Sequence, residues 1–233
     1  MRRLSTRKGT AQVKLFYSAG SPFARKVRIV LIEKGLAFES DIADGGRPID
    51  EAPAPTLAIP VLEDGDLRLW ESDVIVDYLM RTYPHAMAPG GDPPLTPGLT
   101  RPDQHWQDMM TLATISTCGN SIVNLRAMQG DAITPDNSDY MGRQKARAEH
   151  CLDWLEARVT DQGFAPGWFS VMDIAFVCVM SYCEGRDVMP WRGRPRLEAL
   201  YDGSQSRPSV AATPIPWRAP TPPRYVVERK PVA

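Results

Sequence analysis

The sequence predicts an α/β domain over residues 13–84, followed by an all-helical domain over residues 103–213. The first part begins with a short apolar run, a turn and an amphipathic pattern, which together predict a strand, a tight turn and a helix. The second part carries apolar residues at helical spacing over two long segments. Between the two parts, residues 85–102 are rich in proline and glycine and lack periodicity, which is typical of an interdomain linker.

The strongest local signals lie in residues 13–35. Residues 13–17 have the length and the apolar side chains of a buried strand. Ser21 is a good N-cap residue, and Pro22 suits the first helical position because its missing N–H costs nothing there. Gly35 stands where a helix C-cap glycine belongs. The apolar positions of the helix are Phe23, Val27, Val30 and Leu31, and the basic residues between them are Arg25, Lys26 and Arg28.

The helix start at Ser21 is a candidate anion site, because unpaired N–H groups and the positive end of the helix dipole point outward there. A bound thiol must have its pKa lowered by roughly 1.5 to 2 units from about 8.5 to be mostly thiolate at neutral pH, which costs about 2 to 3 kcal/mol. The dipole contributes only about 0.3 to 1 kcal/mol, whereas a hydroxyl that donates to the charged sulfur adds about 1.5 to 3 kcal/mol. A purely structural capping role is the alternative. The two roles are compatible, because capping uses the serine oxygen and leaves its proton free to donate.

A second strand is expected over residues 37–42, parallel to the first because a helix connects them. Residues 44–58 contain Gly-Gly and several prolines, so they are predicted to form a loop. Asp64-Gly65, between two apolar segments, predicts a tight hairpin. Pro60 opens the first strand of that hairpin, where both the cis and the trans form occur and the trans form is commoner.

Glu71 and Ser72 follow the hairpin and open a helix that is expected to end before Pro84. Ser72 is predicted as the N-cap residue, and the backbone amides at this helix start can hold a carboxylate. From the pattern alone, Glu71 is interpreted as an acid beside the positive end of a helix. The first domain therefore has two helix N-termini that can receive anions.

The second half is predicted to be helical, with long helices over residues 103–128 and 140–159. Ser170 with Asp173 three residues later is a variant of the capping box, and the apolar run that follows predicts a central helix. Asp173 is therefore interpreted as structural rather than catalytic. A final short helix is expected around residues 197–201.

The composition argues against several classes of function. The chain has 233 residues with 43% hydrophobic content, which is enough for one large core or two smaller ones. Its formal net charge of -1 argues against a nucleic acid or an acidic membrane surface as partner. No run approaches the ~18 apolar residues of a membrane span, so no membrane partner is expected.

The chain has a basic N-terminal segment, a proline-rich C-terminal segment and four cysteines. Residues 1–12 are basic and free of acids, which favours a disordered arm over an organelle transit peptide, and residues 214–233 form a proline-rich tail. The cysteines lack the dense spacing of a disulfide framework or a zinc site. They are expected to be reduced and mostly buried, without a metal, in a cytoplasmic protein. They are Cys118, Cys151, Cys178 and Cys183.

Over most of residues 14–214, the chain resembles the glutathione transferase family, in its bacterial-like, serine-type, cytosolic form. The resemblance rests on four segments in order: FYSAGSPFARKVRIVLIEKG, IPVLEDGDLRLWESDVIVDYL, FSVMDIA and SRPSVAATP. It implies a thioredoxin-like domain followed by an all-helical domain, usually paired into a homodimer with each glutathione site near the interface. Glutathione would be the co-substrate, and no metal is implied.

The resemblance also implies roles for particular residues. Ser21 would donate a hydrogen bond to the glutathione thiolate. Ile59 would pair its backbone with the cysteinyl part of glutathione, and Pro60 would be the cis proline that presents it. Glu71 and Ser72 match the Glu-Ser pair that binds the γ-glutamyl end.

The sequence matches the family pattern at one further motif and departs from it in one segment. Ser170 and Asp173 match the capping box that helps the family's second domain fold. The segment before Ile59 departs from the family pattern, so no glutathione contact is carried over from it. Tyr17 and Ser18 are alternatives to Ser21, which is preferred because it sits at the helix start.

The implied function is addition of the glutathione thiolate to a small electrophile that lies over the helical domain. One alternative is a non-catalytic member of the same fold that binds ligands or a protein partner. Another is a glutathione-dependent lyase, isomerase or dehalogenase that uses the same sulfur site. A thiol-disulfide exchanger would need a cysteine at the helix start, and no cysteine precedes Cys118.

Overall fold

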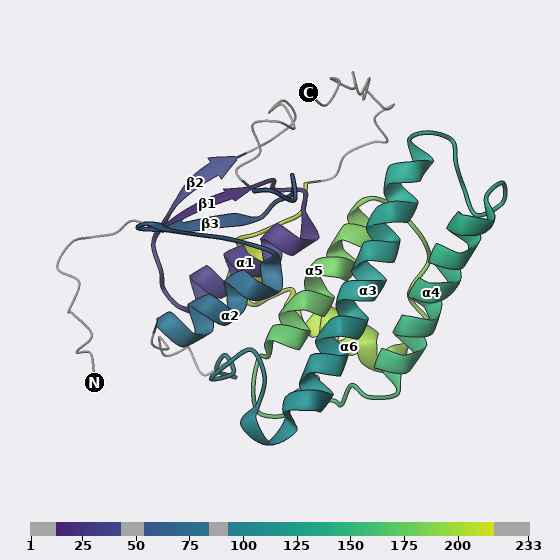
Figure 1. The fold of residues 1–233 in the computed structure, drawn as a ribbon. Coiled ribbons are helices and arrows are strands. Elements are labelled where there is room, and N and C mark those ends of the chain that lie inside the picture. Colours follow the sequence, from purple (N-terminus) through teal and green to yellow (C-terminus); the bar gives the residue numbers. More distant parts are fainter. Residues whose placement is uncertain (1–12, 43–53, 84–92, 217–233) are drawn as a thin grey trace, which may run out of the picture.

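The computed structural model of the protein describes residues 13–42, 54–83 and 93–216. A four-stranded sheet and two helices form the first part, and a bundle of helices forms the second (Figure 1). This architecture confirms the predicted fold class. The predicted arm at 1–12, most of the loop at 44–58 and most of the tail at 214–233 lie outside the described residues, as do residues 85–92 of the linker at 85–102, so those domain boundaries stay predictions.

The sheet has the strand order β2-β1-β3-β4. β1 (Val13–Tyr17) pairs in parallel with β2 (Phe38–Ile42) and antiparallel with β3 (Val61–Asp64), as expected when a helix joins the first two strands. β3 continues through the predicted Asp64-Gly65 turn into β4 (Leu67–Trp70), with Asp64 opposite Leu67. The peptide bond between Ile59 and Pro60, just before β3, is cis.

The helices of both parts are mostly where the pattern predicts them. α1 (Pro22–Glu33) and α2 (Ser72–Thr82) lie between the sheet and the helical bundle (Figure 1). The bundle contains the 3₁₀ turn η3 (Pro102–Gln104), α3 (His105–Gln129), α4 (Asp139–Glu156), α5 (Val171–Gly185) and α6 (Pro195–Ser204), all near predicted positions. A last short helix, α7 (Pro208–Ala211), was not predicted as a separate element.

The basic residues of α1 do not form a solvent-facing stripe. Arg25 and Lys26 are each only 2% exposed, because α1 packs against the sheet on one side and against α5 on the other. Arg25 instead donates through Nε to Thr213 Oγ1 at 3.3 Å and through Nη2 to the Val210 carbonyl at 3.1 Å. One continuous cluster of buried apolar side chains therefore runs from the sheet through α1 into α5.

The C-terminal end of α1 is held by a buried ion pair. Arg207, just before α7, donates through Nε and Nη2 to the two carboxylate oxygens of Glu33, both at 2.7 Å. The side chains are 8% and 6% exposed, and the Ser209 hydroxyl also donates to Glu33. The Arg207 guanidinium lies 4.1 Å from the centre of the Phe169 ring. This pair joins the end of the helical bundle to the first domain.

The start of α5 is the predicted capping box. The Ser170 hydroxyl accepts from the Asp173 N–H at 3.1 Å, and Asp173 Oδ2 accepts from the Ser170 N–H at 2.7 Å. Asp173 Oδ1 also accepts from the Phe164 N–H at 2.9 Å. Burial raises the pKa of Asp173 to about 6, against the hydrogen bonds that favour its charged form. The structural interpretation of Asp173 is confirmed.

The four cysteines are free thiols in the structure. Cys118, Cys178 and Cys183 are buried and Cys151 is half-buried, all as free thiols, as predicted. Burial raises the pKa of Cys178 to about 11 and that of Cys183 to about 12, so both remain protonated near neutrality. Across residues 13–42, 54–83 and 93–216, no helix is both long and apolar enough to span a membrane.

Replacing Glu33 by alanine should lower the free energy of unfolding by about 3 to 5 kcal/mol, because the substitution leaves the Arg207 guanidinium buried without its carboxylate. The measurement is urea unfolding followed by circular dichroism. Asp77→Ala is the matched control, since Asp77 pairs with an exposed Arg81 one helical turn away and should matter little. Equal losses for the two variants would show that the Glu33–Arg207 pair does not fasten the two domains.

Candidate functional site

Two hollows lie side by side where the first domain meets the helical bundle, and Phe23 of α1 forms a wall of both. The β3–α2 hollow has a volume of about 220 Å³, and the α1–α5 hollow one of about 280 Å³. The β3–α2 hollow is lined by Phe23, Thr56, Ala58, Ile59, Pro60, Glu71, Ser72, Asp73, Ser116 and Asn120. The α1–α5 hollow is lined by Ser18, Gly20, Ser21, Pro22, Phe23, Val123, Tyr182 and Arg186.

Ser21 lies in the α1–α5 hollow at the start of α1. It is the N-cap residue, with φ -85° and ψ 124°, and its Oγ accepts from the Ala24 N–H at 3.2 Å. Pro22 follows at the first helical position, as predicted. The capping bond uses the serine oxygen as acceptor, so its proton can be donated to a ligand in the hollow.

The two alternatives to Ser21 have different surroundings. Tyr17 is only 6% exposed within β1, where the Arg28 guanidinium lies 4.8 Å from its ring centre, and it lines neither hollow. Ser18 lines the α1–α5 hollow, and its Oγ accepts from the Gly20 N–H at 3.3 Å. Of the two, only Ser18 is placed near Ser21 at a hollow.

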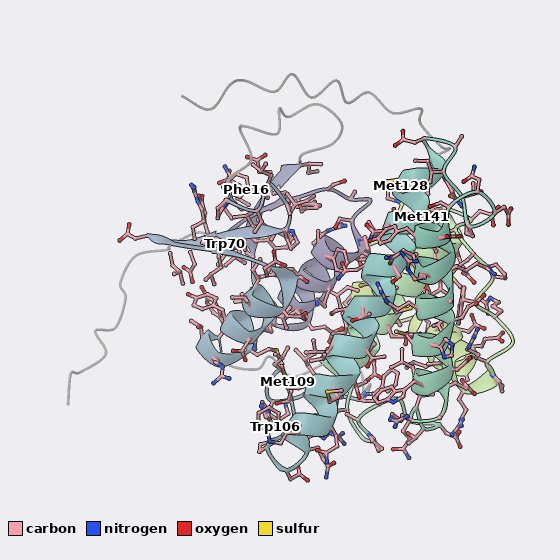
Figure 2. All side chains as sticks on the ribbon, turned by 45° about the vertical axis from the view of Figure 1, so that its right-hand side comes forward. Phe16, Trp70, Trp106, Met109, Met128 and Met141 are labelled. Carbon is pink, nitrogen blue, oxygen red and sulfur yellow. The ribbon has the colours of Figure 1, made fainter. Side chains whose placement is uncertain are left out.

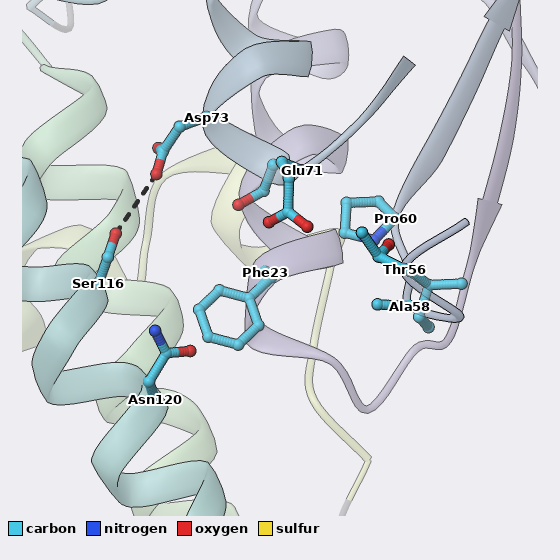
Figure 3. Close-up of a pocket in the computed structure, with 10 residues that line it drawn as sticks. Phe23, Thr56, Ala58, Pro60, Glu71, Asp73, Ser116 and Asn120 are labelled. Atoms are coloured by element: carbon cyan, nitrogen blue, oxygen red, sulfur yellow. Dashed lines mark hydrogen bonds between the residues drawn. The ribbon is translucent and has the colours of Figure 1, made fainter. Parts of the chain in front are cut away.

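Pro60 lies on one side of the β3–α2 hollow and Glu71 on the other (Figure 3), and Ile59 and Ser72 also line it. Pro60 is buried and Ile59 is half-buried, and the cis peptide bond joins them at the entrance to β3. The structure thus brings together in one hollow four of the predicted site residues. Ser21 lies in the adjacent hollow rather than in the same one.

The predicted capping role of Ser72 is wrong. The Ile75 N–H donates to the Glu71 carbonyl at 3.0 Å, so Glu71 is the N-cap residue and Ser72 is the first residue of α2. Glu71 adopts φ 65° and ψ 120°, an unusual backbone conformation for a residue with a side chain. Its carboxylate makes no capping hydrogen bond and projects into the hollow (Figure 3). The chain turns sharply at the end of β4, and this turn moves the helix start by one residue.

Asp73 connects the hollow to both neighbouring helices. Its Oδ1 accepts from the Lys26 ammonium of α1 at 2.5 Å, and its Oδ2 accepts from the Ser116 hydroxyl of α3 at 3.3 Å (Figure 3). The Lys26 side chain is 3% exposed, whereas that of Asp73 is 42% exposed. The Lys26 charge is therefore neutralised by Asp73. Glu71, the other acid that lines the hollow, is not paired with Lys26.

Sequence reasoning missed several residues of the hollows. Ser116 and Asn120 are one turn apart on α3, so helical spacing places them on one face, but only the packing of α3 beside α2 shows that this face borders a site. Thr56 and Ala58 come from the segment before Ile59, for which no contact was carried over. No group of three His, Cys, Asp or Glu side chains that could hold a metal occurs among the described parts of the chain.

The arrangement suits an extended ligand with charged ends and a polarisable atom near Ser21. The start of α2 offers backbone N–H groups to a carboxylate, and Glu71 offers a carboxylate to a cation. The start of α1 offers a hydroxyl donor and the positive end of a helix dipole to a second anion. Phe23, the wall that the hollows share, separates the two regions.

Comparison with known proteins finds relatives of the chain in one family. Residues 15–91 match the family model described as the glutathione S-transferase N-terminal domain. The chain is 31% identical over 212 residues to the uncharacterized GST-like protein YibF of Escherichia coli, covering 88% of this chain and 99% of that protein. It is 29% identical over 136 residues to the stringent starvation protein A homolog of Pasteurella multocida, covering 52% of this chain and 61% of that protein.

Among solved structures, the chain resembles a glutathione S-transferase of Methylobacterium radiotolerans in complex with glutathione sulfonate. The TM-score is 0.72 at 26% sequence identity, with 92% of this chain and 100% of that chain covered. The likeness of the two structures extends over both domains, since 92% of this chain is covered. The chain belongs to the glutathione S-transferase family.

Proposed function

We propose that the protein is a glutathione transferase that adds the glutathione thiolate to small electrophilic substrates, with glutathione as co-substrate. The observation that carries this proposal is the Ser21 hydroxyl, which caps α1 as an acceptor and faces a hollow beside the one formed by Ile59, Pro60, Glu71 and Ser72. The glutathione sulfonate bound to the Methylobacterium radiotolerans relative supports glutathione as the ligand.

Glutathione would bind as an extended tripeptide along the β3–α2 hollow. The Glu71 carboxylate would attract the ammonium group of the γ-glutamyl end, and the hydroxyl and N–H of Ser72 at the start of α2 would bind its carboxylate. The backbone of Ile59, presented by the cis bond to Pro60, would pair with the cysteinyl part. The sulfur would then pass Phe23 and reach Ser21.

Ser21 would stabilise the thiolate without forming a covalent bond. The thiol proton goes to solvent when glutathione binds, and Ser21 donates its own proton as a hydrogen bond to the charged sulfur. The sulfur then forms a bond to the electrophilic carbon, while the electron pair of the broken bond leaves with the leaving group or moves into a conjugated acceptor. Catalysis consists of activation of the thiol and proximity of the two reactants.

A non-catalytic ligand-binding or protein-binding module is the second candidate. It is favoured by the similarity to the stringent starvation protein A homolog, whose name describes no transferase activity. Failure of the wild-type protein to bind glutathione would support this candidate. A glutathione-dependent lyase, isomerase or dehalogenase would share the Ser21 site, and a panel of substrates would separate it from a transferase.

We also propose a cytoplasmic homodimer. Apolar side chains are exposed on both domains, with Val74 of α2 51% exposed, Trp106 of α3 75% exposed and Met110 of α3 59% exposed. Trp106 and Met109 project outward from the first turns of α3 (Figure 2). Contact between two copies would cover these side chains. The free thiols of the four cysteines fit a reducing compartment.

Light scattering after size exclusion should give a mass near twice the 25.9 kDa of one chain. Trp106→Glu should shift the protein toward a single chain, because it places a charge where the dimer needs an apolar contact. Ile133→Glu is the control, since Ile133 is an exposed apolar residue beyond the opposite end of α3. A wild-type mass of 25.9 kDa at high concentration would contradict the dimer.

The test of the transferase proposal is glutathione binding by calorimetry, combined with ultraviolet thiolate absorbance of the bound ligand against pH. Wild-type protein should bind glutathione as thiolate near neutrality. Ser21→Ala should still bind it, but with a thiol pKa about one to two pH units higher, because a hydrogen bond to a charged group contributes about 1.5 to 3 kcal/mol.

Ser18→Ala is the matched control, because Ser18 also carries a hydroxyl, lies in the same loop and lines the same hollow. It should leave the thiol pKa unchanged. An unchanged pKa in Ser21→Ala with a raised pKa in Ser18→Ala would assign the sulfur to Ser18. Absence of glutathione binding in the wild type would overturn the transferase proposal itself.

A further inference from the structure

The β3–α2 hollow contains two acids beside the helix start that is proposed to bind a ligand carboxylate. Glu71 and Asp73 both line the hollow, and none of the described residues that line it is basic. Ser72, between the two acids, is the first residue of α2, where the N–H groups have no partner within the helix. Two uncompensated carboxylates next to these N–H groups would repel an anionic ligand.

Lys26 of α1 compensates one of these acids from outside the hollow. Its ammonium lies 2.5 Å from Asp73 Oδ1, and its side chain is only 3% exposed. Lys26 is not among the residues that line the hollow. A ligand in the hollow would therefore meet this charge through its effect on Asp73, and not by direct contact.

The same contact directs the Asp73 carboxylate away from the helix start. Its Oδ1 is bound by Lys26 of α1, and its Oδ2 accepts from the Ser116 hydroxyl of α3 at 3.3 Å. Figure 3 shows Asp73 directed toward Ser116, whereas Glu71 projects into the hollow. Asp73 lies in the first turn of α2, where a freely moving carboxylate would compete for the unpaired N–H groups. Holding it toward α1 and α3 leaves these groups to a ligand.

We propose that Lys26 is a positioning residue for glutathione: by neutralising and orienting Asp73, it makes the start of α2 selective for the carboxylate of the γ-glutamyl end. This inference rests on the proposed transferase function and deepens it, because it names the residue that sets the charge selectivity of that site. Glu71 is left to meet the ammonium group of the same end.

The test uses two analogues of glutathione, each of which lacks one charge of the γ-glutamyl end. Glutaryl-Cys-Gly keeps the carboxylate, γ-aminobutyryl-Cys-Gly keeps the ammonium group, and affinities are measured by calorimetry on the full chain. Lys26→Met should weaken glutaryl-Cys-Gly roughly 10-fold, because the Asp73 charge is then uncompensated. The same variant should bind γ-aminobutyryl-Cys-Gly equally well or up to about 3-fold more tightly. A merely structural contact would not separate the two analogues.

Asp73→Asn should shift the selectivity in the opposite direction, because the Lys26 charge is then unopposed behind the hollow. The affinity for glutaryl-Cys-Gly relative to γ-aminobutyryl-Cys-Gly should rise by about 3- to 10-fold. The double variant Lys26→Met/Asp73→Asn should return this ratio to the wild-type value, since it removes both charges of the pair. If Lys26→Met does not fold, the ratio in Asp73→Asn decides, and an unchanged ratio there would overturn the proposal.

Lys34→Met is the matched control, because Lys34 is a second buried lysine that joins α1 to α2. It is 4% exposed at the other end of α1, and its ammonium donates to the Tyr83 carbonyl at 2.8 Å. This variant should lower thermal stability and leave the ratio of the two affinities unchanged. Equal weakening of both analogues in Lys26→Met would overturn the role of Lys26 while leaving the transferase proposal standing. Failure of the wild type to bind glutathione would overturn both.

Discussion

The burial of α1 between the sheet and the helical bundle is the constraint on which both hollows depend. This helix carries Ser21 at its start and Phe23 on the wall that the hollows share. Its other end is fixed by the Glu33–Arg207 pair, and its middle by Lys26 with Asp73. Because these two contacts join α1 to different elements, and α1 also packs against α5, a shift of the helix would disturb the positions of α2, α5 and α7 together.

The two hollows differ in the charged side chains that line them. Around the β3–α2 hollow, Lys26 pairs with Asp73. In the proposed function, Glu71 and the N–H groups at the start of α2 meet the two charges of the γ-glutamyl end. The α1–α5 hollow is lined by the Arg186 side chain and by the Ser21 hydroxyl. In the proposed function, a thiolate at Ser21 would be stabilised there by the hydroxyl and by the positive end of the α1 dipole.

Local signals in the sequence were sufficient for much of the fold. Ser21-Pro22, Asp64-Gly65 and the Ser170–Asp173 box each depend on neighbours a few residues away, and each forms as predicted. The helix start near Ser72 was missed by one residue, because it depends on the sharp backbone turn at Glu71.

Features that depend on packing between distant segments could not be predicted from the sequence. Burial of Arg25 and Lys26, and the approach of Arg186 to Gly20, arise from the contact of α1 with the helical bundle. The most direct test of the account is a crystal structure of the wild-type protein with glutathione. The sulfur should lie within hydrogen-bond distance of Ser21 Oγ, with the γ-glutamyl end at Glu71 and Ser72. Glutathione bound elsewhere, or with its sulfur directed away from the start of α1, would contradict the account.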